Sequence, residues 1–244
     1  MTVSQPSSQA LARITGVIYL ILIVAGIYGS VVVRANLIFP GDATTTAQQI
    51  MSAEGSFRIS IVSDLTMIVA DVALAVLFFV LLKQVSYVLA LVTTLFRLTQ
   101  ASILGLNLLN LTLALNLLTS SDVAELADSQ RHSLAMLFLT AQGIGYDLGL
   151  VFFAVSLMAL GYVLLRSSRI PKLIIAALIL SAGVYLVGSL ITILVPNLRS
   201  MFEVAYLLPF VAELALAGWL TVRGLRLSEV SDGNVINPQQ KRYA

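Results

Sequence analysis

Six hydrophobic stretches, each long enough to cross a lipid bilayer, occupy most of this 244-residue chain. A transmembrane helix needs about 20 predominantly apolar residues, because the hydrocarbon core is about 30 Å thick and a helix rises about 1.5 Å per residue. Unpaired backbone groups are too costly in hydrocarbon, so such stretches form helices. We therefore expect an all-α fold, a transmembrane bundle of six spans. The expected spans are Leu11–Val33, Phe57–Leu82, Tyr87–Leu118, Leu134–Leu165, Lys172–Leu194 and Met201–Val222.

The composition excludes several other classes of protein. Apolar residues make up 59% of the chain and charged residues only 11%, with a mean hydropathy of +0.97, which is far from the usage of soluble domains. No basic cluster suits nucleic acid, so the expected partner is the lipid bilayer. The chain has no cysteine and a single histidine, His132, which excludes thiolate sites and sites built on several imidazoles. We expect neither a metal nor a cofactor.

Basic residues predict the orientation in the membrane, because cytoplasmic flanks carry an excess of lysine and arginine. With the N-terminus in the cytoplasm, nine basic residues flank the spans or follow them on that side, against four on the other. We therefore expect both termini in the cytoplasm and the protein in a cell membrane. The first span is longer than a signal-peptide core and lacks a cleavage site, so we expect it to be retained. Residues 1–227 are predicted to form one membrane domain and residues 228–244 a polar, disordered cytoplasmic tail.

Four ionisable residues lie near the midpoints of predicted spans, namely Asp71, Arg97, Asp147 and Glu213. Such residues are costly in hydrocarbon and are usually paired or face a cavity. Arg97 stays protonated and needs an anionic partner. A short turn at Lys83 joins the second and third spans, so Asp71 is the expected partner. Two acids then remain, and at least one is expected to be protonated or hydrogen-bonded.

A second polar layer is predicted in the second and third spans. Asp64 precedes Asp71 by almost two helical turns and shares its face. Gln100, Asn107 and Asn110 fall on one face of the third span. We expect these stripes to line a polar cleft that opens outward. The alternative is that they hold the helices together, as buried amides and carboxylates do in membrane bundles.

The fourth span combines a Tyr146-Asp147 pair with two glycines. Gly145 and Gly149 form a small-xxx-small pair, which indicates close helix packing. A Tyr-Asp pair beside glycines also resembles a motif of intramembrane aspartyl proteases, but Asp71 lacks the second motif of that class. In the sixth span, Pro209 precedes Glu213 by four residues and predicts a kink.

Several motifs in order resemble a known family. They are Arg13-Ile14-Thr15-Gly16, Phe39-Pro40-Gly41-Asp42-Ala43, Ser63-Asp64, Asp71-Val72-Ala73-Leu74, Phe96-Arg97, Leu106-Asn107-Leu108-Leu109-Asn110 and Gly145-Tyr146-Asp147-Leu148-Gly149. Together they resemble a prokaryotic membrane family catalogued as domain of unknown function 4386, from about Arg13 to Gly224. The resemblance implies a six-span bundle in a prokaryotic plasma membrane, with no assigned activity. Histidines at the positions of Gln142 and Ser156, and an aspartate at that of Gly188, belong to the family pattern and are absent here.

The excess of intramembrane acid over Arg97 favours binding or transport of a small polar or cationic solute. The candidate residues are Asp64, Asp71, Arg97, Gln100, Asn107, Asn110, Tyr146, Asp147 and Glu213. One alternative is an intramembrane enzyme that modifies lipids, which the absence of a recognisable nucleophile–base motif disfavours. Another is a structural or partner-binding membrane protein, in which the acids affect stability only.

Overall fold

The computed structural model describes residues 8–121, 125–167 and 169–225. These residues form helices and connections without a strand, and six helical segments are long and apolar enough to cross a membrane. The all-α, six-span prediction is therefore confirmed. The predicted tail, 228–244, lies outside the described residues. The α-helices are α1 (Ser8–Ile27), α2 (Ala35–Leu37), α3 (Ala43–Ser52), α4 (Glu54–Leu82), α5 (Tyr87–Thr119), α6 (Asp128–Ser167), α7 (Lys172–Leu194), α8 (Arg199–Phe202) and α9 (Leu207–Arg223).

The exterior of the bundle is apolar, and many of its polar and charged side chains are buried inside. Val24, Leu106 and Leu173 are 65%, 71% and 82% exposed, whereas Arg97 is fully buried. A soluble protein would bury such aliphatic side chains, whereas a lipid-facing surface exposes them. The protein is therefore a multi-pass membrane protein.

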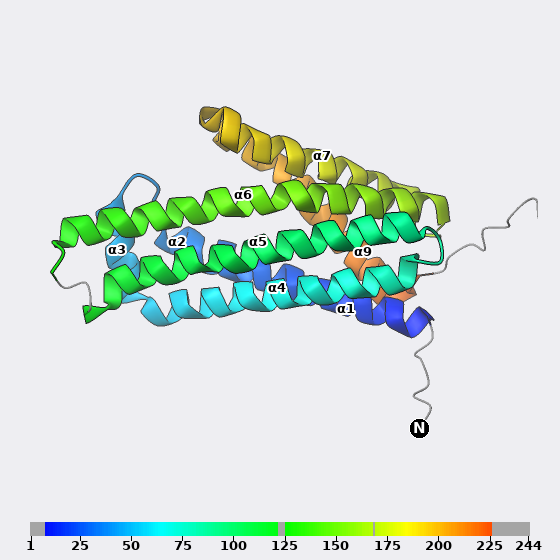
Figure 1. Ribbon diagram of the computed structural model, residues 1–244, viewed down its shortest axis with the longest axis horizontal. Helices are drawn as coiled ribbons and strands as arrows, with labels where there is room; N and C mark the ends of the chain where they lie inside the picture. The colour runs from blue at the N-terminus through cyan, green and yellow to red at the C-terminus, as the bar shows by residue number, and fades with distance from the viewer. Residues whose placement is uncertain (1–7, 122–124, 168, 226–244) are drawn as a thin grey trace, which may run out of the picture.

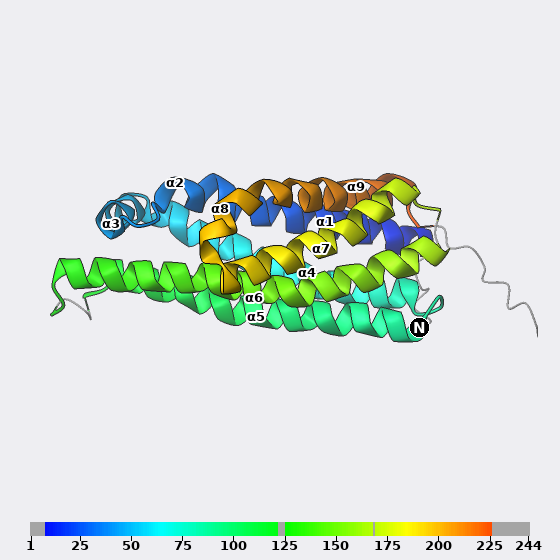
Figure 2. The ribbon, with the colours of Figure 1, turned by 90° about the horizontal axis from the view of Figure 1, so that it is seen from above.

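The long helices run along one axis, with α4, α5 and α6 side by side (Figure 1). Helix α1 packs against α4 and α9, and α9 packs in turn against α7. The start of α1, the α4–α5 turn at Lys83, the α6–α7 turn and the end of α9 gather at one end, called here the Lys83 end. Helix α3 and the α5–α6 connection lie at the other, called here the α3 end (Figure 2).

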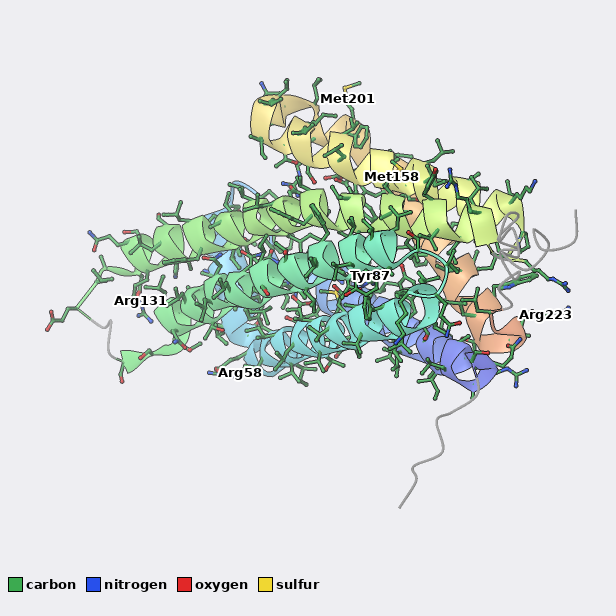
Figure 3. The ribbon with its side chains drawn as sticks, turned by 45° about the vertical axis from the view of Figure 1, so that its right-hand side comes forward. Arg58, Tyr87, Arg131, Met158, Met201 and Arg223 are labelled. Atoms are coloured by element: carbon green, nitrogen blue, oxygen red, sulfur yellow. The ribbon has the colours of Figure 1, made fainter. Side chains whose placement is uncertain are left out.

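Helices α6 and α7 differ greatly in length, and this difference sets the position of the site. Helix α6 has 40 residues and α7 has 23, or about 60 Å and about 35 Å. Helix α6 ends and α7 begins at the Lys83 end. The segment after α7 therefore lies beside the middle of α6. That segment, the α7–α9 connection, consists of 3₁₀ turns Pro196–Leu198 and Glu203–Tyr206 around α8. It projects from the bundle with Met201 at its tip, while Arg223 lies at the Lys83 end (Figure 3).

Local sequence signals account for several helix boundaries. Asp42 caps α3, because its Oδ1 accepts from the Thr45 backbone N–H at 2.9 Å and its Oδ2 from the Thr45 hydroxyl at 2.7 Å. These hydrogen bonds lower the pKa of Asp42 from its ordinary value. The small-xxx-small pair lies where α6 meets α5: a side chain at Gly145 would collide with Asn107, and one at Gly149 would contact Leu104.

Two helix features differ from the sequence expectation. The first span does not end at Val33, but continues through a π-helix, Tyr28–Arg34, into α2. The sixth span begins with a 3₁₀ turn, and Pro209 is the third residue of α9 rather than an interior residue. Proline is tolerated in a first helical turn, where the backbone N–H has no intrahelical partner. Instead of a kink in the middle of the span, the span therefore changes from a 3₁₀ turn to an α-helix just before Pro209.

Candidate functional site

Arg97 and Asp71 form an ion pair inside the bundle, as the α4–α5 hairpin predicts. Arg97 Nε lies 2.5 Å from Asp71 Oδ1, and the arginine side chain has no exposed surface. Its guanidinium carbon lies 5.3 Å from the ring centroid of Tyr19 and 5.0 Å from that of Phe153. The arginine is thus held by one carboxylate and by aromatic faces, which attract a cation in a low-dielectric site.

Glu213 lies near this pair but has different partners. The Tyr19 hydroxyl donates to Glu213 Oε2 at 2.8 Å, and the Tyr185 hydroxyl donates to Oε1 at 2.6 Å. The tyrosines come from α1 and α7, so the carboxyl of α9 joins three helices. The sequence interpretation included neither tyrosine among its candidate residues. Their positions near the middle of apolar spans are the signal that could have identified both.

A small cavity of about 80 Å³ lies beside the Arg97–Asp71 pair. Arg97, Asp71, Gln100 and Glu213 line it together with apolar side chains. Arg97 Nη1 and Nη2, Asp71 Oδ2 and Gln100 Oε1 are buried and have no hydrogen-bond partner among the described residues. Buried polar atoms are normally satisfied, so these atoms can donate hydrogen bonds to, or accept them from, a small polar molecule that enters the cavity.

A larger chamber of about 370 Å³ adjoins the small cavity. Both volumes share the wall residues Tyr146, Tyr185 and Glu213. The chamber extends from there to the α7–α9 connection, where exposed Glu203 forms part of its wall. Its volume falls within the range of about 300–1,000 Å³ typical of small-molecule sites.

The aromatic side chains of the chamber come from α6, the α7–α9 connection and the last two spans. They are Tyr146, Tyr185, Phe202, Tyr206 and Phe210. Tyr185 and Tyr206 have ring centroids 5.9 Å apart. Gly188 lies in the same wall, and a side chain there would collide with the Tyr206 hydroxyl. The absence of a side chain at Gly188 therefore lets Tyr206 close over the chamber.

Asp147 lies at a different depth from the other three mid-span charges, which corrects the expectation of one layer. Asp71, Arg97 and Glu213 are each about ten residues, or about 15 Å, from the helix end at the Lys83 end. Asp147 is about 20 residues, or about 30 Å, from that end of α6. The interpretation was wrong because α6 extends far beyond the bilayer thickness, so its midpoint is not the midpoint of the bundle.

The partner of Asp147 is Arg199 of the α7–α9 connection. Arg199 Nη1 lies 3.3 Å from Asp147 Oδ2, and the two side chains are 47% and 6% exposed. Both residues line the large chamber. The pair therefore ties the connection to α6 at the exposed side of the chamber.

A second buried ion pair joins Arg34 to Asp64, and the sequence interpretation missed it. Arg34 Nη2 lies 2.9 Å from Asp64 Oδ2, and Arg34 Nη1 donates to the Ser60 hydroxyl at 3.4 Å. The count of basic residues treats Arg34, which follows the predicted end of the first span, only as a flank of the membrane. The π-helix turns its side chain inward, and Gly29 makes room, because a Cβ there would lie 2.5 Å from Asp64 Oδ1. A glycine shortly before a basic residue at a span end was the available signal.

Asn107 connects α5 to α6, and Asn110 bonds to Asn107 within α5, and neither lines either cavity. Asn107 Nδ2 donates to the Gln142 carbonyl at 2.8 Å, and Asn110 Nδ2 donates to Asn107 Oδ1 at 2.9 Å. Together with Asp64, they lie outside both lining sets, and the predicted cleft along α4 and α5 is replaced by a chamber that α1, α6, α7 and α9 enclose. Of the predicted set, the two cavities bring together Asp71, Arg97, Gln100, Tyr146, Asp147 and Glu213.

The described part of the chain contains no group of three or more histidines or carboxylates placed to hold a metal ion. The lining of the chamber offers carboxylates, the guanidinium of Arg199, hydroxyl groups and aromatic rings. These groups can bind a polar or charged molecule through ion pairs, hydrogen bonds and cation–π contacts.

The comparisons with known proteins agree with the resemblance seen in the motifs. An uncharacterised protein of the archaeon Archaeoglobus fulgidus is 27% identical over 172 residues, which cover 70% of this chain and 87% of that protein. No solved structure matches. A family profile matches residues 14–224, close to the extent expected from the motifs. The chain therefore belongs to the family described as domain of unknown function (DUF4386).

Proposed function

We propose that the protein binds a small organic cation in the large chamber and carries it across the membrane. The observation that carries this proposal is the Glu213 carboxyl, which borders both cavities and is held by tyrosine hydroxyls instead of a cation. A cationic ligand would supply the missing charge partner.

The charge balance of the two cavities supports a cation. Their lining includes Asp71, Asp147, Glu203 and Glu213 against only Arg97 and Arg199. Asp71 and Asp147 already contact these arginines. The two glutamates remain without an arginine partner, and a carboxylate of this kind beside a low-dielectric cleft attracts a cation when it is ionised.

The aromatic wall supports an organic cation over a bare metal ion. Recognition of alkylammonium groups commonly uses several aromatic faces, each worth about 0.5–2 kcal/mol. Tyr146, Tyr185 and Tyr206 supply such rings beside Glu213. A bare metal ion would instead require several oxygen ligands from the protein converging on one point.

The cell membrane and the orientation are part of this proposal. The excess of basic residues at the Lys83 end, of which Lys83, Arg166 and Arg223 are examples, supports a cytoplasmic location for that end. The α7–α9 connection, and with it the exposed side of the chamber, would then face outward.

Binding and uptake of labelled tetraethylammonium test the proposal. Purified protein in detergent should bind it saturably, and proteoliposomes should take it up, whereas labelled glucose should neither bind nor enter. If neither binding nor uptake of several quaternary ammonium ions exceeds that of empty liposomes, the proposal fails. Formation of a new product from labelled lipid extract would instead favour the enzyme alternative.

Two glycines of α7 provide a matched pair of variants. Gly188→Leu places a side chain in the chamber wall, where Tyr206 already lies in contact distance. Gly183→Leu adds the same side chain five residues earlier, where nothing lies within 4 Å of an added Cβ. We expect loss of binding in the first variant and retention in the second. Equal affinity in both would place the cation outside the chamber.

A further inference from the structure

Glu213 is a carboxyl in the membrane interior without a cation in direct contact, although Arg97 lines the same small cavity. The side chain belongs to a residue only 6% exposed, and among the described residues no arginine or lysine nitrogen lies within 4.0 Å of it. An ionised carboxylate in such a place is costly unless a positive charge compensates it. Two states avoid this cost, the neutral acid and the carboxylate with a bound cation.

The hydrogen bonds of Glu213 suit both states. With the carboxylate, Tyr19 and Tyr185 each donate to one oxygen. With the acid, one carboxyl oxygen carries a proton and donates to a tyrosine oxygen, because a phenol hydroxyl can donate or accept. The tyrosine proton then turns toward another acceptor. Tyr185 lines both cavities, so this change can occur at the chamber without moving a helix.

The other titratable groups around Glu213 are already engaged or lie farther away. The surrounding helices present Tyr19, Asp71, Arg97, Tyr146, Asp147 and Tyr185. Asp71 and Asp147 contact arginines. Glu203 and Tyr206 face the chamber from the α7–α9 connection, and Glu203 is exposed there. Glu213 is therefore the buried acid of this set that is free to exchange its charge partner.

We infer that a proton and the organic cation compete for Glu213, so that the protein exchanges one for the other. This inference rests on the proposed function. When the cation enters, the O–H bond of the neutral carboxyl breaks, the proton leaves to water in the chamber, and the carboxylate pairs with the cation. Charge is conserved, since one positive charge replaces another. Return of the proton releases the cation.

Calorimetry on the full-length protein in detergent tests the exchange. Tetraethylammonium is titrated in buffers of equal pH and different ionisation enthalpy, and the dependence of the heat on the buffer gives the number of protons released. We expect about one proton released per cation bound. The apparent Kd should fall about tenfold for each unit rise in pH, as long as Glu213 is protonated in the empty protein. Glu54→Gln serves as the matched control, because Glu54 lines neither cavity and its side chain is 42% exposed, and it should behave as the wild type.

Glu213→Gln should release no proton, and any remaining binding should be independent of pH. Because this variant can lose stability, the wild type provides a second readout. The infrared C=O stretch of a protonated carboxyl should be present in the empty protein and diminish when tetraethylammonium is added. These measurements should cover roughly pH 5 to 9, the range in which a shifted carboxyl would titrate. If the cation binds with no proton release and no infrared change, the exchange is overturned and the proposed function stands. Absence of any cation binding overturns both.

Discussion

Arg97 and Asp71 contact each other at 2.5 Å where the arginine side chain has no exposed surface, so this ion pair joins α4 to α5 entirely within the bundle. The pair also borders the small cavity, with both terminal nitrogens of the arginine unpaired among the described residues. The ion pair therefore contributes both to the stability of the bundle and to the lining of the small cavity. A pair of this kind is costly to break from one side, because the remaining charge stays buried.

Arg97→Leu should destabilise the protein by about 3–5 kcal/mol, and Arg97→Leu combined with Asp71→Leu should recover much of that loss. Unfolding in detergent with increasing denaturant measures both changes. The exposed pair Arg58–Glu54, with side chains 56% and 42% exposed, offers a control, and Arg58→Leu should change stability by less than about 1 kcal/mol. A double variant no more stable than the single would assign the arginine another partner.

Gly29→Ala should destabilise the Arg34–Asp64 pair. The added Cβ would lie 2.5 Å from Asp64 Oδ1 and 3.2 Å from Arg34 Nη1, and such overpacking costs about 1–3 kcal/mol. Gly183→Ala is the matched control, since its Cβ would meet nothing within 4 Å. Alanine there should be neutral or stabilising by up to about 1 kcal/mol. Unfolding curves of equal midpoint for the two variants would show that the space at Gly29 is not needed.

Single cysteines should reveal the orientation, and the chain has none of its own. Met51→Cys places a thiol on α3, at a residue 40% exposed, and Gln84→Cys places one in the α4–α5 turn. A membrane-impermeant maleimide should label the first in intact cells and the second only after permeabilisation. The reverse pattern would place the Lys83 end outside.

The spans were predictable because the bilayer imposes both the length and the apolar character of each helix. The Arg97–Asp71 pair was predictable as well, since a short turn keeps α4 and α5 adjacent and at equal depth. The predicted depth of Asp147 was wrong because hydropathy does not reveal that α6 is longer than α7 by many residues. Arg34 was missed because a π-helix changes which side of the span faces inward, and no periodic pattern in the sequence marks it.

The chamber itself could not be predicted for a related reason. Its walls come mainly from the first, fourth, fifth and sixth spans and the α7–α9 connection, and only the packing of α7 and α9 brings Tyr185 to Glu213. The order of helices around a bundle depends on many weak contacts that a single sequence does not display. Intramembrane acids identified the chemistry of the site, but not the helices that enclose it.

The most direct measurement of the central claim is a crystal structure with a bromine-containing quaternary ammonium ion bound. Its anomalous signal should give a peak inside the chamber, between Glu213 and the rings of Tyr185 and Tyr206, and Glu213→Gln should weaken that peak. Peaks confined to the lipid-facing surface or to the ends of the bundle, at a concentration that saturates uptake, would contradict the proposed binding site.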